Sequence, residues 1–151
     1  VEGREKKEGE KVSYDISLRD PVTQETLCAE FEHEMTGGTY AVGGTKELWL
    51  NVTYNYAGWY YRPGVFGPTR EESKGVRTIY GMSGAESIPV LQKAIAALQA
   101  MTEDISDEER RQCEEQGATG YWMPTRANAI RPLYQLLAMA KIRPDGVWDG
   151  D

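Results

Sequence analysis

The chain has few of the residues that build metal centres and disulfides. It contains two cysteines, Cys28 and Cys113, and a single histidine, His33. No Cys-x-x-Cys or paired-histidine spacing connects them, so a zinc site is not expected. The aspartates within residues 145–151 lack the spacing of a calcium loop, and we expect this acidic segment to fray. We see no signal peptide, so the two cysteines predict a reducing compartment in which both thiols are free. We expect the protein to bind no metal and no cofactor.

Long apolar runs and an excess of positive charge are also missing. No stretch approaches the roughly 18 apolar residues that span a bilayer, so we expect a cytoplasmic protein without membrane contact. The formal net charge of −7 and the pI of about 4.9 argue against direct nucleic-acid binding, which requires a basic face. A solvated acidic surface is the simpler interpretation, while mimicry of DNA on another protein's nucleic-acid site stays open.

Length and composition predict one domain. A chain of 151 residues with 40% hydrophobic content can bury a core without cross-links. Residues 1–11 carry eight charges and one apolar side chain. They therefore predict a disordered charged leader, or a segment added for expression, that the domain over residues 12–151 does not need for stability.

Two segments near the start of the domain alternate between apolar and polar residues. The alternation over residues 12–18 and 27–35 predicts two strands, and Asp20-Pro21 predicts a turn between them. We expect these strands to form an antiparallel hairpin with an acidic face exposed to water.

Residues 45–61 fit either a strand or a helix. Apolar residues alternate from Leu48 to Tyr56, as in a strand, but Thr45 can cap a helix that only Gly58 interrupts. We favour the helix because strands are usually about 3–10 residues long. In that helix the side chains of Asn51, Asn55 and Trp59 would share one stripe with Leu48 and Val52 and point into the protein.

Three later helices have clear start signals. Ser83 and Glu86 match a capping box, Ser106 precedes an acidic first turn, and Thr125 can cap the last helix. Between these elements we expect a loop over 62–75 and a short strand or extended connector over 76–80. The fold class predicted is α+β, with the N-terminal hairpin packed against three to four helices. The predicted helices start at residues 83, 106 and 125 and end near Met101, Gly117 and Pro144.

Two glycine motifs approach catalytic sequences but depart from them. Residues 38–45 resemble a Walker A loop, yet Gly44 stands where that motif has its lysine, and Lys46 comes two positions late. A glycine turn with a helix cap is the simpler interpretation, and anion binding at the helix start stays open. Residues 81–85 approach a nucleophile elbow, but Ala85 replaces its closing glycine and His33 lies upstream. We therefore regard an enzyme as less expected than a binding protein.

The segment over residues 37–62 is the predicted location of a binding pocket. Its aromatic and amide side chains can form a flat, hydrogen-bonding surface, and arginines can complement an anionic ligand. Buried amides need polar partners, which are either internal or a ligand. Asn128 and Arg126 are further polar groups that could take part. The candidate ligand-binding residues are Thr39, Tyr40, Thr45, Asn51, Tyr54, Asn55, Trp59, Arg62 and Arg77.

Four strings together carry a family resemblance: GGTYAVGGT, WLNVTYNYA, GVRTIYGMSGAESIPVL and RPDGVWDGD. They resemble a family of small uncharacterised proteins encoded by phages and prophages of gut Firmicutes. The likeness covers roughly residues 14–151, with residues 62–75 and 102–123 extended relative to the pattern. The resemblance implies a phage accessory role in the host cell and assigns no role to any residue.

These observations lead to two hypotheses of function. In the favoured one, the protein binds a host protein and inhibits a host defence factor. In the alternative, it binds a small anionic or nucleotide ligand in the pocket over residues 37–62, and it could then be an enzyme. The sequence leaves the oligomeric state open, a homo-oligomer included.

Overall fold

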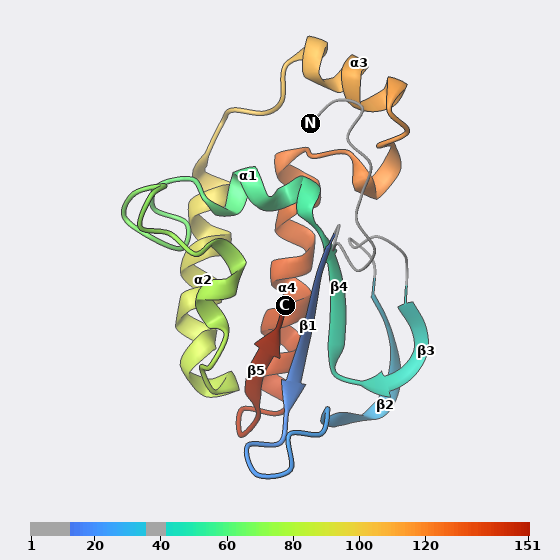
Figure 1. Cartoon of the computed structure of the whole chain (residues 1–151), viewed down its shortest axis with the longest axis vertical. Helices are drawn as coiled ribbons and strands as arrows, with labels where there is room; N and C mark the ends of the chain where they lie inside the picture. The colour runs from blue at the N-terminus through green and yellow to red at the C-terminus, as the bar shows by residue number, and fades with distance from the viewer. Residues whose placement is uncertain (1–12, 36–41) are drawn as a thin grey trace.

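The computed structural model describes residues 13–35 and 42–151, which form a single α+β domain, as predicted (Figure 1). The predicted leader lies outside these residues, so its dispensability remains a prediction. The main sheet of the described chain is antiparallel, with strand order β4-β1-β5. Its strands are β1 (Ser13–Arg19), β4 (Trp49–Thr53) and β5 (Val147–Gly150).

The central strand β1 has one apolar and one polar face. Tyr14 lies opposite Val52 and Ile16 opposite Leu50, and all four side chains are buried. Side chains alternate across a strand, so Asp15 and its cross-strand partner Asn51 occupy the other face. The apolar face is therefore the one that receives the helices.

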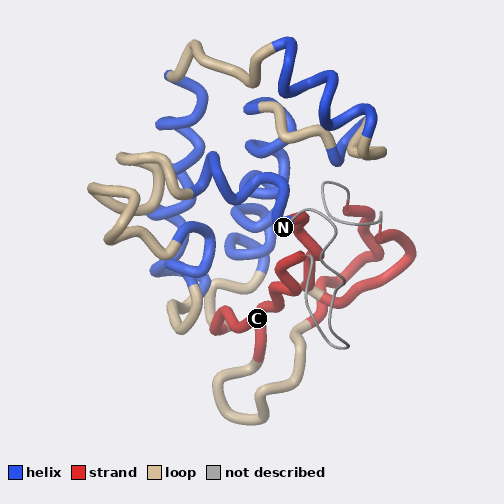
Figure 2. The backbone as a smooth tube through the Cα atoms, turned by 45° about the horizontal axis from the view of Figure 1, so that its top comes forward, coloured by secondary structure: helices blue, strands red, loops and turns tan. Residues whose placement is uncertain are grey.

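Two long helices cover the apolar face of the sheet. Leu91 and Leu98 of the helix Gly84–Ala100 pack in one hydrophobic core with the strand residues. Leu133 and Leu136 of the helix Arg126–Ile142 belong to the same core. In Figure 2 the helices gather on one side of the molecule and the strands on the other. The α-helices of the described chain are α1 (Ala57–Tyr60), α2 (Gly84–Ala100), α3 (Asp107–Glu115) and α4 (Arg126–Ile142).

The predicted helix starts are confirmed. Ser83 and Glu86 form both hydrogen bonds of the capping box before α2. Ser106 and Thr125 accept hydrogen bonds from the main chain at the starts of α3 and α4. Helix α3 buries none of its residues, in agreement with its polar sequence. None of the helices in the described part of the chain is long and apolar enough to cross a bilayer.

The predicted N-terminal hairpin is wrong in its pairing, although both of its strands exist. Strand β2 (Cys28–Met35) pairs with β3 (Val42–Glu47), and these two strands form a second sheet that we call the ribbon. A single bridge between Arg19 and Thr26 and the hydrogen bond from the Leu27 N–H to the Leu18 carbonyl at 2.8 Å link β1 to the chain before β2. Strand β1 bonds to β4 along one edge and β5 along the other, so it has no edge left for β2.

Residues 45–61 are not one helix. They continue through the end of β3 and all of β4, and turn helical only at the 3-10 helix Tyr54–Tyr56, which leads into α1. Pairing of β4 with β1 buries Leu50 and Val52 on the strand period and outweighs the helix-start signal. The stripe predicted to join Asn51, Asn55 and Trp59 therefore does not exist.

Two smaller predictions also change. The segment predicted as a strand or extended connector over residues 76–80 lies mainly in the 3-10 helix Gly75–Ile79. The acidic end does not fray, because Val147–Gly150 is strand β5. Trp148 holds this end of the chain in place. Its indole is buried opposite Leu18, and the indole Nε1 donates to the Ser87 hydroxyl at 2.8 Å.

Candidate functional site

The structure does not gather the predicted site residues into one pocket. Thr39 and Tyr40 lie outside the described residues. Thr45 lies within β3, and its hydroxyl accepts the Glu47 N–H at 3.1 Å. The predicted anion site at a helix start is therefore wrong, because Gly43 and Gly44 lie within β3 and no helix begins at Thr45.

Asn51 has internal partners. Its side chain is 3% exposed, and Nδ2 donates to Ser13 Oγ at 2.7 Å and to Asp15 Oδ1 at 2.8 Å. All three residues lie on the polar face of the main sheet, away from Leu50 and Val52. Asn51 thus joins β4 to β1 across the sheet, and its inward position results from the strand, not from a helical stripe.

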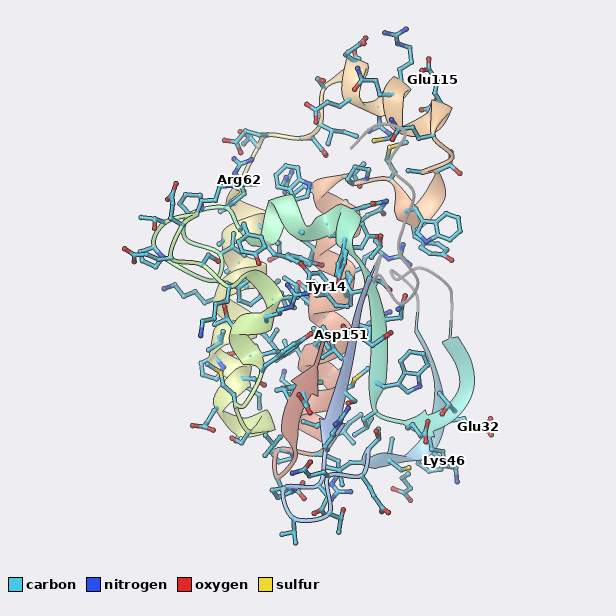
Figure 3. All side chains as sticks on the ribbon, viewed as in Figure 1. Tyr14, Glu32, Lys46, Arg62, Glu115 and Asp151 are labelled. Atoms are coloured by element: carbon cyan, nitrogen blue, oxygen red, sulfur yellow. The ribbon has the colours of Figure 1, made fainter. Side chains whose placement is uncertain are left out.

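Tyr54 and Arg77 contact each other at a different location, beside the C-terminal strand β5. The Arg77 guanidinium lies 4.7 Å from the ring centre of Tyr14 and 5.8 Å from that of Tyr54. Its Nε donates to the main-chain oxygen of Asp151 at 2.7 Å, close to Tyr14 in Figure 3. Burial raises the pKa of Tyr14 to about 12, so its hydroxyl keeps its proton at neutral pH. The contacts of this guanidinium hold the end of β5 against β1, which is a structural role.

Asn55, Trp59 and Arg62 do share a pocket. It measures about 420 Å³ and lies between α1, the following loop and the start of α3. Segments far apart in the sequence build it, which is why the stretch over residues 37–62 could supply only part of its wall. The other lining residues are Gly58, Arg70, Asp104, Ile105, Glu109 and Pro124.

The wall of this pocket is fixed by hydrogen bonds from α1 and the preceding 3-10 helix to the chain before α4. Trp59, 8% exposed, donates from Nε1 to the main-chain oxygen of Pro124 at 2.9 Å. Asn55 is exposed, contrary to prediction, and its Nδ2 donates to the main-chain oxygen of Trp122 at 2.9 Å. The Arg62 guanidinium lies 5.2 Å from the Trp59 ring centre. The lining of the pocket thus combines an ordered aromatic side chain with an amide and a cation.

The ribbon is a separate exposed feature that the sequence did not predict. Phe31 is 74% exposed, although the alternation of β2 placed it on the apolar face. Figure 3 shows Glu32 and Lys46 on the ribbon, away from the helices. Phe31 thus occupies a position that the sequence pattern predicts to be buried, but its side chain is exposed. This disagreement distinguishes the ribbon from the rest of the surface.

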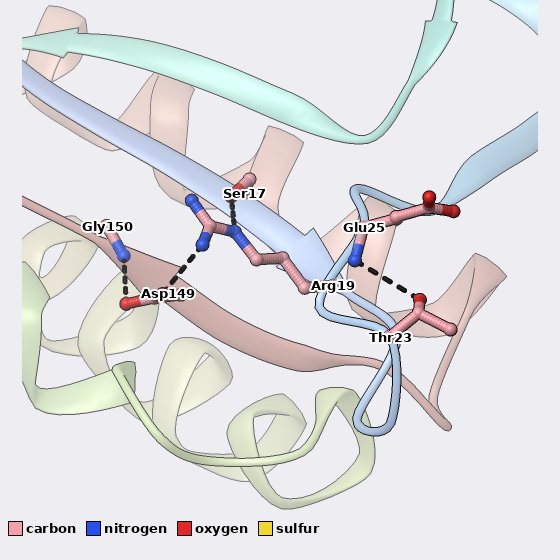
Figure 4. Close-up of polar contacts among 6 residues, drawn as sticks. All are labelled: Ser17, Arg19, Thr23, Glu25, Asp149 and Gly150. Atoms are coloured by element: carbon pink, nitrogen blue, oxygen red, sulfur yellow. Dashed lines mark hydrogen bonds and ion pairs between the residues drawn. The ribbon is translucent and has the colours of Figure 1, made fainter.

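The remaining polar motifs are structural. Arg19 donates from Nε to Ser17 Oγ at 2.8 Å and from Nη1 to Asp149 Oδ2 at 2.9 Å (Figure 4). Asp149 therefore ties β5 to β1. Over residues 13–35 and 42–151, no cluster of histidine, cysteine and acidic side chains could hold a metal ion. Ser83 of the elbow-like motif is a helix cap.

No family model, curated protein or solved structure matches the chain. The family resemblance thus remains an expectation.

Proposed function

We propose that the protein works by binding another protein through the ribbon. The observation that carries this proposal is the exposure of Phe31 on a strand whose apolar face begins inside the core. Leu27 is buried and Ala29 is half-buried on that face, whereas Phe31, two residues further, is not covered. Covering such a side chain is worth about 1.5–3 kcal/mol, and buried aromatic residues dominate many protein interfaces.

The charged side chains of the ribbon indicate the partner's overall charge. Glu30, Glu32 and Glu47 are exposed on the ribbon, and Lys46 is the exposed cation beside them. Three negative charges and one positive charge leave a net charge of −2 on these four side chains. We infer a partner with an apolar pocket for Phe31 and a net positive charge, which would speed association with the negatively charged ribbon at low salt.

The biological setting follows from the resemblance. A phage accessory protein that inhibits a host defence factor would act by such a contact, without catalysis. Mimicry of DNA has less support, because α3, the most polar helix, does not present a continuous row of negative charge. Its acidic first turn is followed by Arg110 and Arg111, and Arg111 pairs with Glu108.

A photo-crosslinking amino acid at position 31 tests the proposal in bacterial cells. The control places it at Tyr134, which is 48% exposed on α4, away from the ribbon. We expect one host protein to be captured from position 31 and not from position 134. Calorimetry with that purified protein should then show binding weakened at least about tenfold by Phe31→Ala, a loss of about 1.4 kcal/mol, and unchanged by Tyr134→Ala. Equal effects of the two substitutions would refute the ribbon as the interface.

A further inference from the structure

We infer that the pocket between α1 and α3 is a second binding site, for a nucleoside monophosphate whose base carries an exocyclic amine. This site is independent of the ribbon. Its volume of about 420 Å³ lies within the usual range of small-molecule sites, about 300–1,000 Å³. Trp59, Ile105 and Pro124 supply the apolar surface against which a base can pack.

Gly58 is the first reason to assign a ligand to this pocket. It lies inside α1, is exposed, and a Cβ added to it would meet nothing within 4 Å. Neither its backbone conformation nor a neighbouring atom requires glycine, and alanine is the better helix former. The absence of a side chain is useful only if the space beside the helix must stay open.

Two arginines are the second reason. Arg70 is exposed and makes no ion pair or hydrogen bond with any described residue. Arg62 approaches one carboxylate, that of Glu103, at 3.5 Å, and both side chains are partly open to water. Guanidinium groups bind phosphate oxygens through paired hydrogen bonds, so these two cations can hold a phosphate at the pocket mouth.

Two carboxylates also line the pocket, and they act on the base of the ligand. Asp104 Oδ1 accepts the N–H groups of Ile105 at 2.8 Å and Arg126 at 3.1 Å, so it is held in place. Glu109 Oε1 lies 3.2 Å from the Ser106 hydroxyl. A carboxylate accepts hydrogen bonds and repels oxygen atoms. A base with an exocyclic amine, such as adenine, therefore suits this wall better than one with a carbonyl oxygen at the same position.

Titration of ¹⁵N-labelled protein with AMP tests the assignment by NMR. We expect saturable shifts of the Gly58 amide, the Trp59 indole and the Asn55 side-chain amide. IMP has a carbonyl oxygen in place of the amine and a proton on the adjacent ring nitrogen, and it should bind about fivefold more weakly than AMP. Adenosine and inorganic phosphate each keep one half of the ligand and should bind at least about tenfold more weakly than AMP.

Three variants connect the shifts to the pocket. Arg70→Gln should weaken AMP binding about tenfold. Lys93→Gln removes the same charge from the exposed side of α2 and should leave AMP binding unchanged. Gly58→Leu should fill the pocket and abolish AMP binding with the rest of the spectrum unchanged. If Gly58→Leu does not fold, the comparison of the two glutamine variants decides. Phe31→Ala should leave AMP binding unaltered, so failure here is distinguishable from failure of the ribbon proposal.

Four results would overturn the inference. The first two are that AMP causes no shifts at about 10 mM, or causes shifts only outside the pocket. The third is that Arg70→Gln and Lys93→Gln have equal effects on AMP binding. The fourth is that IMP or inorganic phosphate binds as tightly as AMP.

Discussion

Ser87→Ala should destabilise the protein by removing the hydroxyl that accepts the N–H of a buried indole. Ser87 and Trp148 are both buried, and the serine hydroxyl accepts the indole N–H at 2.8 Å while donating to the Gly84 carbonyl at 2.8 Å. An unsatisfied buried N–H costs about 1–3 kcal/mol, and the better helix propensity of alanine offsets about 0.5 kcal/mol. The expected net loss is about 0.5–2.5 kcal/mol, or roughly 1–10 °C in Tm for a domain of this size.

Equilibrium urea unfolding followed by circular dichroism measures this loss. A double-mutant cycle with Trp148→Phe isolates the pair, because phenylalanine removes the N–H that Ser87 accepts. We expect the double variant to lose about 0.5–3 kcal/mol less than the sum of the single variants. Gln92→Ala, on the exposed side of the same helix, is the matched control and should change stability by no more than about 0.5 kcal/mol. Additive losses, or a Ser87→Ala variant as stable as the control, would refute a stabilising contact between α2 and β5.

Three further predictions concern the helix cap, the buried tyrosines and the pocket helix. Ser83→Ala should cost about 0.5–2 kcal/mol in urea unfolding through the lost capping box, and a variant of unchanged stability would contradict the cap. Burial raises the pKa of Tyr56 from 10.0 to about 12, so the contribution of Tyr56 to stability should be constant below pH 10 and be lost as the pH rises from 10 through about 12. Tyr56→Phe should flatten that fall in thermal melts across this window, and an unchanged slope would contradict it. Gly58→Ala should raise stability by about 0.4–1 kcal/mol, because a Cβ there meets no atom and restricts the unfolded chain; a loss of stability would show that the position is not open.

The parts of the fold that local sequence determines were predictable. The starts of α2, α3 and α4 follow from Ser83, Ser106 and Thr125, because a capping side chain acts on N–H groups within its own turn. The pairing of β1 was not predictable in this way. Both of its partners, β4 and β5, are distant in sequence, and nothing local to residues 12–35 indicates that they occupy the two edges that β2 would need.

The candidate pocket was predictable only in part for the same reason. Asn55, Trp59 and Arg62 come from the aromatic segment singled out in the sequence, but Asp104 and Glu109 come from around the start of α3. Their approach depends on how the connection from α2 crosses above α1, which is a property of helix packing (Figure 1). The composition of residues 37–62 indicated the amide, the indole and the cation of the pocket. Its two carboxylates could be recognised only once the fold was known, because they come from a distant part of the sequence.

Phe31 and Gly58 are the positions where local pattern and observed surroundings disagree most clearly. The alternation of β2 predicts a buried Phe31, and a helix interior favours alanine over glycine at residue 58. Neither departure stabilises the isolated chain, since Phe31 is exposed and the space beside Gly58 is open. Such conflicts are expected where a protein meets something other than itself. Arg62 lines the pocket, and Figure 3 shows it on the opposite side of the molecule from Glu32 of the ribbon. The two proposed binding functions can therefore be removed one at a time.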